Sequence, residues 1–157
     1  MIVAGGAGWQ SAAMKPPIEI VLEKAPLRED RKQLEREIDL FNARTVAGED
    51  ERFAPFLRDS AGLLVGGLDG VIGWAWLFVE SLWVHDDLRG RGLGRELLAR
   101  AERLAVERGC HSAWLDTFQA RGFYERLGYA VFATLEHYPP GQTRYFLRKR
   151  LEAAGDG

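Results

Sequence analysis

The chain has 157 residues, of which 46% are hydrophobic and 28% are charged, and its formal net charge is −2. This length and composition suit one globular domain with a real hydrophobic core. The chain has no lysine-rich run, which argues against a nucleic-acid partner. It also lacks an apolar stretch of the roughly 18–20 residues that cross a bilayer, so we expect no membrane partner. The single cysteine, Cys110, cannot form an intramolecular disulfide, and we expect a cytoplasmic protein.

The beginning of the chain has no periodicity that predicts a helix or a strand. We expect residues 1–16 to be a disordered or non-native extension, residues 17–152 to form a single domain, and residues 153–157 to be a tail. The first predicted strand covers Ile18–Leu22, where apolar residues alternate with other residues. A helix is predicted from Arg28 to about Thr45 because apolar residues recur there at helical spacing.

The middle of the chain predicts a hairpin and a further strand. Strands are expected over Ala61–Leu68 and Val71–Val79, joined by a tight turn at Asp69-Gly70, and a fourth strand over about Glu80–His85. A weak or absent helix would fall near Glu51–Leu57.

The second half of the chain predicts two helices and three strands. An apolar stripe predicts a helix from Leu93 to about Arg108, which Gly109 ends. A strand over His111–Asp116 and a short helix over Gln119–Leu127 are expected after it. Two further strands are expected over Tyr129–Glu136 and Thr143–Lys149, joined by a Pro-Pro-Gly turn. This order implies a mixed, largely antiparallel sheet with helices on both faces.

The most informative motif is a glycine-rich turn between a predicted strand and the helix that begins at Leu93. It reads Arg89-Gly90-Arg91-Gly92-Leu93-Gly94. Such a turn leaves backbone N–H groups unpaired at the positive end of a helix dipole, where a phosphate or pyrophosphate can bind. The glycine spacing fits neither a Walker loop nor a dinucleotide fingerprint. A tight turn that only caps a helix is the structural alternative.

Two motifs together carry a resemblance to a known family. Arg89, Gly92 and Gly94 fit the pattern Arg/Gln-x-x-Gly-x-Gly/Ala, which resembles the pyrophosphate loop of the GCN5-related N-acetyltransferase (GNAT) superfamily. The stretch Thr117–Tyr129 looks like the second signature of that superfamily. Its matching positions are Ala120, Phe123, Tyr124, Gly128 and Tyr129. The resemblance covers about residues 71–151, and the ending 137–151 looks like a small bacterial branch of acetyltransferases.

The resemblance implies an α/β (α+β) acyl-CoA N-acyltransferase fold, in which the fourth and fifth strands splay apart around acetyl-CoA. Main-chain groups of Trp83, Val84 and His85 would pair with the pantetheine arm, and N–H groups from Arg89 to Arg95 would hold the diphosphate. Thr117 stands where many relatives carry Asn, and its reach is shorter. The full set of expected cofactor-binding residues is Trp83, Val84, His85, Arg89, Gly90, Arg91, Gly92, Leu93, Gly94, Arg95, Thr117, Ala120 and Tyr124.

The implied reaction moves an acetyl group from acetyl-CoA to a primary amine by direct attack in a ternary complex. Tyr124 stands at the position that serves as general acid in many members, and a phenol is protonated at neutral pH. Glu80 is the first candidate for the general base, and His85 and Asp116 are the alternatives. The packing of Tyr124 within its helix and the exposure of Glu80 at a strand end are the structural alternatives.

The acceptor is expected to be a small amine, although its identity does not follow from the sequence. Residues expected to line its pocket are Phe41, Trp74, Trp76 and Tyr138. No metal site is expected, because the histidines are isolated. Similar proteins commonly form homodimers, and a homodimer is one option here. A non-catalytic domain that binds or senses acetyl-CoA or CoA is the alternative function, and a different phosphate-ligand binder is a third.

Overall fold

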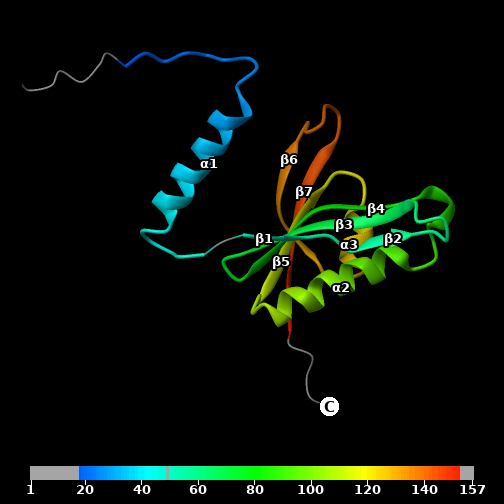
Figure 1. Ribbon diagram of the computed structural model, residues 1–157. Coiled ribbons are helices and arrows are strands. Elements are labelled where there is room, and N and C mark those ends of the chain that lie inside the picture. Colours follow the sequence, from blue (N-terminus) through cyan, green and yellow to red (C-terminus); the bar gives the residue numbers. More distant parts are fainter. Residues whose placement is uncertain (1–17, 49, 153–157) are drawn as a thin grey trace, which may run out of the picture. The chain divides into compact units, whose positions relative to one another are not determined.

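The computed structural model describes residues 18–48 and 50–152 (Figure 1). The chain divides into two compact units, Met1–Thr45 and Val46–Gly157, which we describe separately. The predicted extension and the predicted tail lie outside the described residues. None of the helices in the described ranges is long and apolar enough to cross a membrane.

The first unit contains the helix α1, Arg28–Asn42. Glu29 and Asp30 lie in its first turn, where acidic side chains interact favourably with the helix dipole. The predicted helix is therefore confirmed. The predicted strand at Ile18–Leu22 is wrong, because these residues belong to no strand. Alternating apolar residues favour a strand only where a partner supplies the ladder of hydrogen bonds, and no sheet pairing in the described chain includes them.

The second unit is built on a 7-stranded sheet in the order β1-β3-β4-β5-β7-β6, with β2 also paired to β3 (Figure 1). Among the strands of the described residues, β4 and β5 run parallel and every other pair is antiparallel. The strands are β1 Glu51–Phe53, β2 Phe56–Arg58, β3 Leu64–Gly73, β4 Trp76–Val84, β5 Ser112–Thr117, β6 Ala130–Glu136 and β7 Thr143–Arg150. The predicted mixed, mostly antiparallel α/β architecture is confirmed.

The hairpin lies further along the chain than the sequence predicts. Asp69 and Gly70 are inside β3, and the turn is formed by Trp74 and Ala75, which have φ angles of 48° and 62°. The glycine at position 70 serves close packing instead of a turn, because a Cβ there would lie 2.9 Å from Cζ of Phe53. The predicted turn at Asp69-Gly70 is therefore wrong.

The region near Glu51–Leu57 forms β1 and β2 instead of a weak helix. Both short strands pair with β3, so the long hairpin strand supplies the hydrogen-bond partners that decide their conformation. Local sequence gives little sign of this, because strands of this length have almost no pattern of their own.

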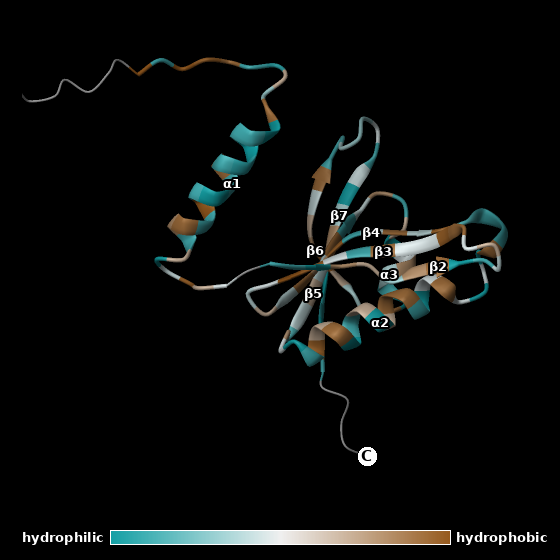
Figure 2. Cartoon of the chain, viewed as in Figure 1, coloured by the Kyte–Doolittle hydropathy of each residue, from teal (hydrophilic) through white to brown (hydrophobic). Residues whose placement is uncertain are grey.

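The core lies between the sheet and the helix α2, Leu93–Glu107, which packs against β3 and β4. Apolar and polar positions alternate along this helix in Figure 2, and its buried residues are Leu97, Leu98, Ala101 and Ala105. Leu68, Leu77, Leu115 and Leu147 of the strands are almost fully buried in the same cluster. Burial of side chains of this size is the main favourable term in folding. Cys110 also belongs to this core.

Candidate active site

The sheet opens between β4 and β5. Their parallel pairing ends at Val79 and Leu115, although β4 continues to Val84 and β5 to Thr117. On its other side β4 carries a bulge: Val79 pairs with Gly70 and Ser81 with Asp69, so Glu80 is the extra residue. A bulge bends a strand and increases its twist, which turns the end of β4 away from β5. The predicted splay of these strands is confirmed.

A glycine-rich turn follows β4 and the short 3₁₀ helix η1, Asp86–Leu88. The N–H of Arg89 donates to the carbonyl of Asp86, and the N–H of Glu96 donates to the carbonyl of Gly92. Between them, the N–H groups of residues 90–95 donate to no acceptor in the described chain. Gly90 and Gly92 have φ angles of 76° and 78°, which glycine adopts without strain. The unpaired groups lie at the N-terminus of α2, where an anion is favoured.

A cavity of about 490 Å³ connects this turn with the end of β4 and with the short helix α3, Arg121–Glu125. Most of the expected cofactor-binding residues line it: Trp83, Val84, Arg89, Gly90, Gly92, Leu93, Gly94, Arg95, Ala120 and Tyr124. Because anion-binding amides and an apolar channel share one cavity, its shape suits a ligand with a phosphorylated end and a long uncharged arm.

The other three expected residues, His85, Arg91 and Thr117, do not line the cavity. The ring of His85 accepts the N–H of Asp87 at 3.3 Å and thereby caps η1. The hydroxyl of Thr117 accepts the N–H of Ala120 at 3.1 Å, which fixes the approach to α3. Arg91 is also absent from the lining.

The side chain of Arg89 binds other residues of the chain. Its Nε donates to the carbonyl of Val84 at 3.1 Å and its Nη2 pairs with Asp86 at 2.8 Å, which ties the turn to the strand end. Arg95 lines the cavity and forms no ion pair within the described residues, so its charge is available to a ligand.

Sequence reasoning missed four residues that line the cavity, namely Leu82, Leu88, Phe123 and Arg126. Leu82 shares a face of β4 with Val84, so the strand's period of two could have identified it. Phe123 belongs to the signature that contains Tyr124. Arg126 gives no signal in the sequence, because only the fold of α3 brings it to the cavity.

Tyr124 is buried, with 7% of its surface exposed, and its side chain lines the cavity. Burial raises the pKa of its phenol to about 12, and the negative charge of Asp116 adds to this effect. The Phe123 ring packs edge-on against it at 5.0 Å between centroids. Tyr124 is therefore protonated at neutral pH, and its hydroxyl is available as a hydrogen-bond donor.

Glu80 forms a two-pronged ion pair with Arg52, at 2.8 and 3.2 Å. The hydrogen bonds from Arg52 hold the pKa of Glu80 below its usual range, in opposition to a smaller effect of burial. Asp116, an alternative base at the end of β5, accepts a hydrogen bond from Nη1 of Arg144. Each carboxylate thus has a cationic partner of its own, and neither lines the cavity.

The residues expected to contact the acceptor are spread over the chain. Trp74 forms the β3–β4 turn, and Trp76 begins β4 and packs edge-on against His111. Both lie at the end of β4 away from Val84, about 25 Å along a strand of this length. The structure does not bring them to the cavity. Tyr138 lies in the β6–β7 connection, and Phe41 belongs to α1 of the first unit.

In the described residues no group of three or more His, Cys, Asp or Glu side chains could hold a metal ion.

Comparison with known proteins agrees with this geometry. The model of the acetyltransferase (GNAT) family matches residues 18–129. A blasticidin-S acetyltransferase of Streptomyces morookaense is 46% identical over 104 residues, which cover 64% of this chain and 76% of the relative. An acetyltransferase of Agrobacterium fabrum is 37% identical over 97 residues, which cover 60% and 71%.

The fold is shared with solved structures. A crystal structure of an acetyltransferase from Bacillus cereus superposes with a TM-score of 0.73 and 27% identity, over 83% of this chain and 98% of that one. The family match includes the splayed strands, the glycine-rich turn and α3. The chain therefore belongs to the GNAT family of acetyltransferases.

Proposed function

We propose that the protein transfers an acetyl group from acetyl-CoA to a primary amine of a small acceptor, by direct attack in a ternary complex. The observation that carries this proposal is the shared cavity: Gly90 and residues 92–95, whose amides are unpaired, line it together with Tyr124. The blasticidin-S acetyltransferase relative, which by its name acts on a small molecule, supports a small acceptor.

The residues present fit acetyl-CoA. The amides of the glycine-rich turn would hold its diphosphate, and the charges of Arg95 and Arg126 in the lining would add to the attraction. β4 continues beyond the end of its pairing with β5, so an extended arm could add along its edge as a strand would, beside the Val84 carbonyl that accepts Nε of Arg89. When bound, acetyl-CoA supplies an acetyl group activated as a thioester.

Tyr124 has the properties of a general acid. Attack on a thioester expels a thiolate, which leaves more easily when a proton is at hand. The raised pKa of Tyr124 keeps its phenol protonated at neutral pH, so the hydroxyl can donate a hydrogen bond to the sulfur as negative charge develops on it. Burial also excludes water, which strengthens every electrostatic interaction in the cavity.

A base has to take the proton from an ammonium acceptor, because only the neutral amine attacks. We assign this step to Glu80, at the bulge where β4 turns away from β5. Its low pKa makes Glu80 a weak base, which would not keep the proton of the amine. We therefore propose that the proton passes through water near Glu80 to the solvent.

The same low pKa favours the second candidate, a domain that binds acetyl-CoA or CoA without catalysis, because a carboxylate held by Arg52 accepts a proton poorly. Both candidate functions require acetyl-CoA or CoA to bind, but only the acetyltransferase transfers the acetyl group to an amine.

Two measurements on the full chain test the proposal. Calorimetry with acetyl-CoA is expected to show binding, and a panel of amines is expected to include one that releases free CoA thiol. Binding without thiol release across the panel would favour the non-catalytic domain. A lack of binding at about millimolar acetyl-CoA would exclude both functions.

A further inference from the structure

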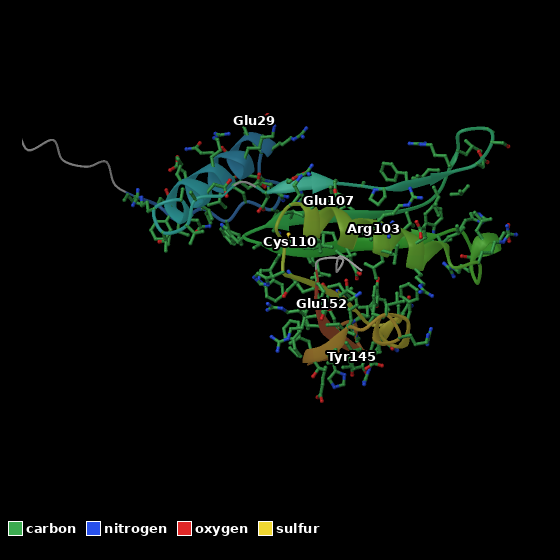
Figure 3. All side chains as sticks on the ribbon, turned by 90° about the horizontal axis from the view of Figure 1, so that it is seen from below. Glu29, Arg103, Glu107, Cys110, Tyr145 and Glu152 are labelled. Atoms are coloured by element: carbon green, nitrogen blue, oxygen red, sulfur yellow. The ribbon has the colours of Figure 1, made fainter. Side chains whose placement is uncertain are left out.

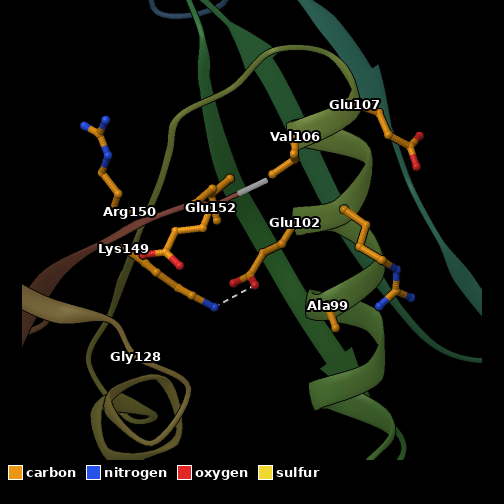
Figure 4. A pocket seen from close by; sticks show the side chains of 10 residues that line it. Ala99, Glu102, Val106, Glu107, Gly128, Lys149, Arg150 and Glu152 are labelled. Carbon is orange, nitrogen blue, oxygen red and sulfur yellow. Dashed lines mark hydrogen bonds and ion pairs between the residues drawn. The ribbon is translucent and has the colours of Figure 1, made fainter. Parts of the chain in front are cut away.

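A partly buried polar network connects α2 with the segment that carries Tyr124. The hydroxyl of Tyr129 donates to Oε1 of Glu102 at 2.9 Å, and Nζ of Lys149 donates to Oε2 of the same carboxylate at 2.7 Å. Side chains of Glu102 and Lys149 are only 15% and 26% exposed, and Tyr129 is 3% exposed. Figure 4 shows the Glu102–Lys149 pair crossing between α2 and β7.

The pair borders a groove of about 730 Å³ that is separate from the cofactor cavity. Charged side chains of α2 and of the chain beyond β7 line the groove, among them Arg103, Glu107 and Glu152 (Figure 3). Glu107 lies on the same helix and is exposed. Glu102 differs from it because it accepts hydrogen bonds from Tyr129 and Lys149.

Tyr129 contacts Tyr124 in two ways. Its ring packs edge-on against the Tyr124 ring at 5.8 Å between centroids, and its N–H donates to the carbonyl of Tyr124 at 3.1 Å. The ring and the backbone of Tyr124 therefore both depend on where Tyr129 lies.

The helix that carries Tyr124 cannot hold this position alone. α3 runs only from Arg121 to Glu125, and a single turn is unstable without tertiary packing. After it the chain reverses at Gly128, whose φ is 90°, directly before Tyr129. A tether immediately after this reversal limits the movement of the whole segment.

The tether begins on the helix that also forms the anion site. Gly92 precedes the first turn of α2, and Glu102 lies about 15 Å further along its axis. A rigid helix thus fixes the diphosphate site at one end and the Tyr129 anchor near its middle.

We propose that Glu102 is a positioning residue, which acts through Tyr129 to set the distance between the diphosphate site and the phenol of Tyr124. Lys149 completes the arrangement, because it neutralises the partly buried carboxylate and holds its second oxygen. This inference rests on the proposed function for its kinetic consequence, while its structural consequence is independent of it.

The test compares Glu102→Ala and Tyr129→Phe with Glu107→Ala, a matched control on the same helix and the same groove. Steady-state kinetics are expected to show a kcat about 10- to 100-fold lower for the first two variants, with the KM for acetyl-CoA within about twofold, as for a misplaced catalytic group. The control is expected to behave as wild type. Tyr129→Phe removes only one oxygen, so it keeps the test informative if Glu102→Ala does not fold.

Amide hydrogen exchange of residues 121–129 is measured on the same variants and needs no turnover. We expect exchange there to become about tenfold faster in both variants, and residues 92–96 to be unchanged. Loss of thermal stability with wild-type kcat in the folded protein would show a merely structural role and overturn the proposal, as would unchanged exchange over 121–129. If the wild-type chain transfers no acetyl group, the proposed function fails, and hydrogen exchange alone decides the positioning role.

Discussion

The guanidinium carbon of Arg144 lies 4.3 Å from the centre of the Tyr138 ring. The same guanidinium donates to Asp116, whose charge contributes to the raised pKa of Tyr124. Tyr138 is half-exposed, and Arg144 and Asp116 are partly buried. The ion pair of Arg144 with Asp116 therefore relates the Tyr138 ring to the charge that acts on the Tyr124 phenol. The sequence predicts that Tyr138 contacts the acceptor.

Replacement of Tyr138 is expected to weaken acceptor binding without affecting the cofactor. Tyr138→Ala removes the ring that packs on Arg144, and we expect the KM for the acceptor amine to rise about tenfold, with the KM for acetyl-CoA unchanged, which corresponds to about 1.4 kcal/mol. Tyr138→Phe keeps the ring and serves as the control. An equal rise in both KM values would argue against an acceptor role.

The pH dependence of turnover is expected to be one-sided. Because burial and Asp116 raise the pKa of Tyr124 to about 12, its proton is lost only above that pH. We therefore expect kcat to rise between about pH 6 and pH 9, as the bound amine loses its proton, and to show no descending limb from Tyr124. Stopped assays of CoA thiol across this range measure the profile.

Tyr124→Phe supplies the control for this profile. The variant keeps the ring packing against Phe123 and Tyr129 but loses the proton donor, so kcat is expected to fall about 10²-fold, with little change in cofactor affinity. A wild-type kcat in this variant would remove Tyr124 from the mechanism. A descending limb near the ordinary tyrosine pKa that is present in the native enzyme and absent from Tyr124→Phe would instead show that the pKa of Tyr124 is not raised.

The turn that holds the diphosphate can be tested through backbone strain. The φ of Gly92 is 78° and an added Cβ would meet no atom within 4 Å, so Gly92→Ala introduces strain without a clash. A non-glycine residue in this conformation costs roughly 1–2 kcal/mol, and we expect the Kd for acetyl-CoA to rise about tenfold. Calorimetry measures the Kd directly.

Gly109→Ala is a matched control, because Gly109 lies just beyond the other end of α2 with a φ of 83° and equally open space. It is expected to lose similar thermal stability and to keep the wild-type Kd. If both variants weaken binding equally, general destabilisation would explain the effect, and the amides around Gly92 would lose their special role.

The predictions that the structure confirms mostly rest on patterns of residues that are adjacent in the sequence. The stripe of α2 and the glycines before it are adjacent in the sequence, so periodicity and turn chemistry located both the helix and the turn with unpaired amides before it. The β3–β4 hairpin was misplaced because Asp69-Gly70 has a strong local turn signal, whereas pairing with β1 and β4 keeps these residues extended. Arg126 and the partner of Glu80 escaped prediction because tertiary structure alone brings them to their places.

The ion pair of Glu80 with Arg52 illustrates the consequence for function. The two residues are 28 positions apart, and they meet because β1 pairs with β3 beside the bulge that displays Glu80. A sequence pattern can identify a carboxylate at this position, but only the fold shows that its pKa is lowered. The pKa of Glu80, which decides how well it can act as a base, is therefore set by Arg52 of β1, a strand that the sequence did not predict.

Replacement of Glu80 decides whether it acts as the base. Glu80→Gln keeps the size of the side chain and removes its basicity, and we expect kcat to fall about 10²-fold, the lower end for general-base catalysis, because the low pKa makes it a weak base. Arg52→Met should raise the pKa of Glu80 towards its ordinary value, since the stabilising hydrogen bonds are lost, and leave the rising limb between about pH 6 and pH 9 with the amine. If Glu80→Gln turns over at the native rate while Asp116→Asn does not, Asp116 instead accepts the proton of the amine. The charge of Asp116 is the one that contributes to the raised pKa of Tyr124.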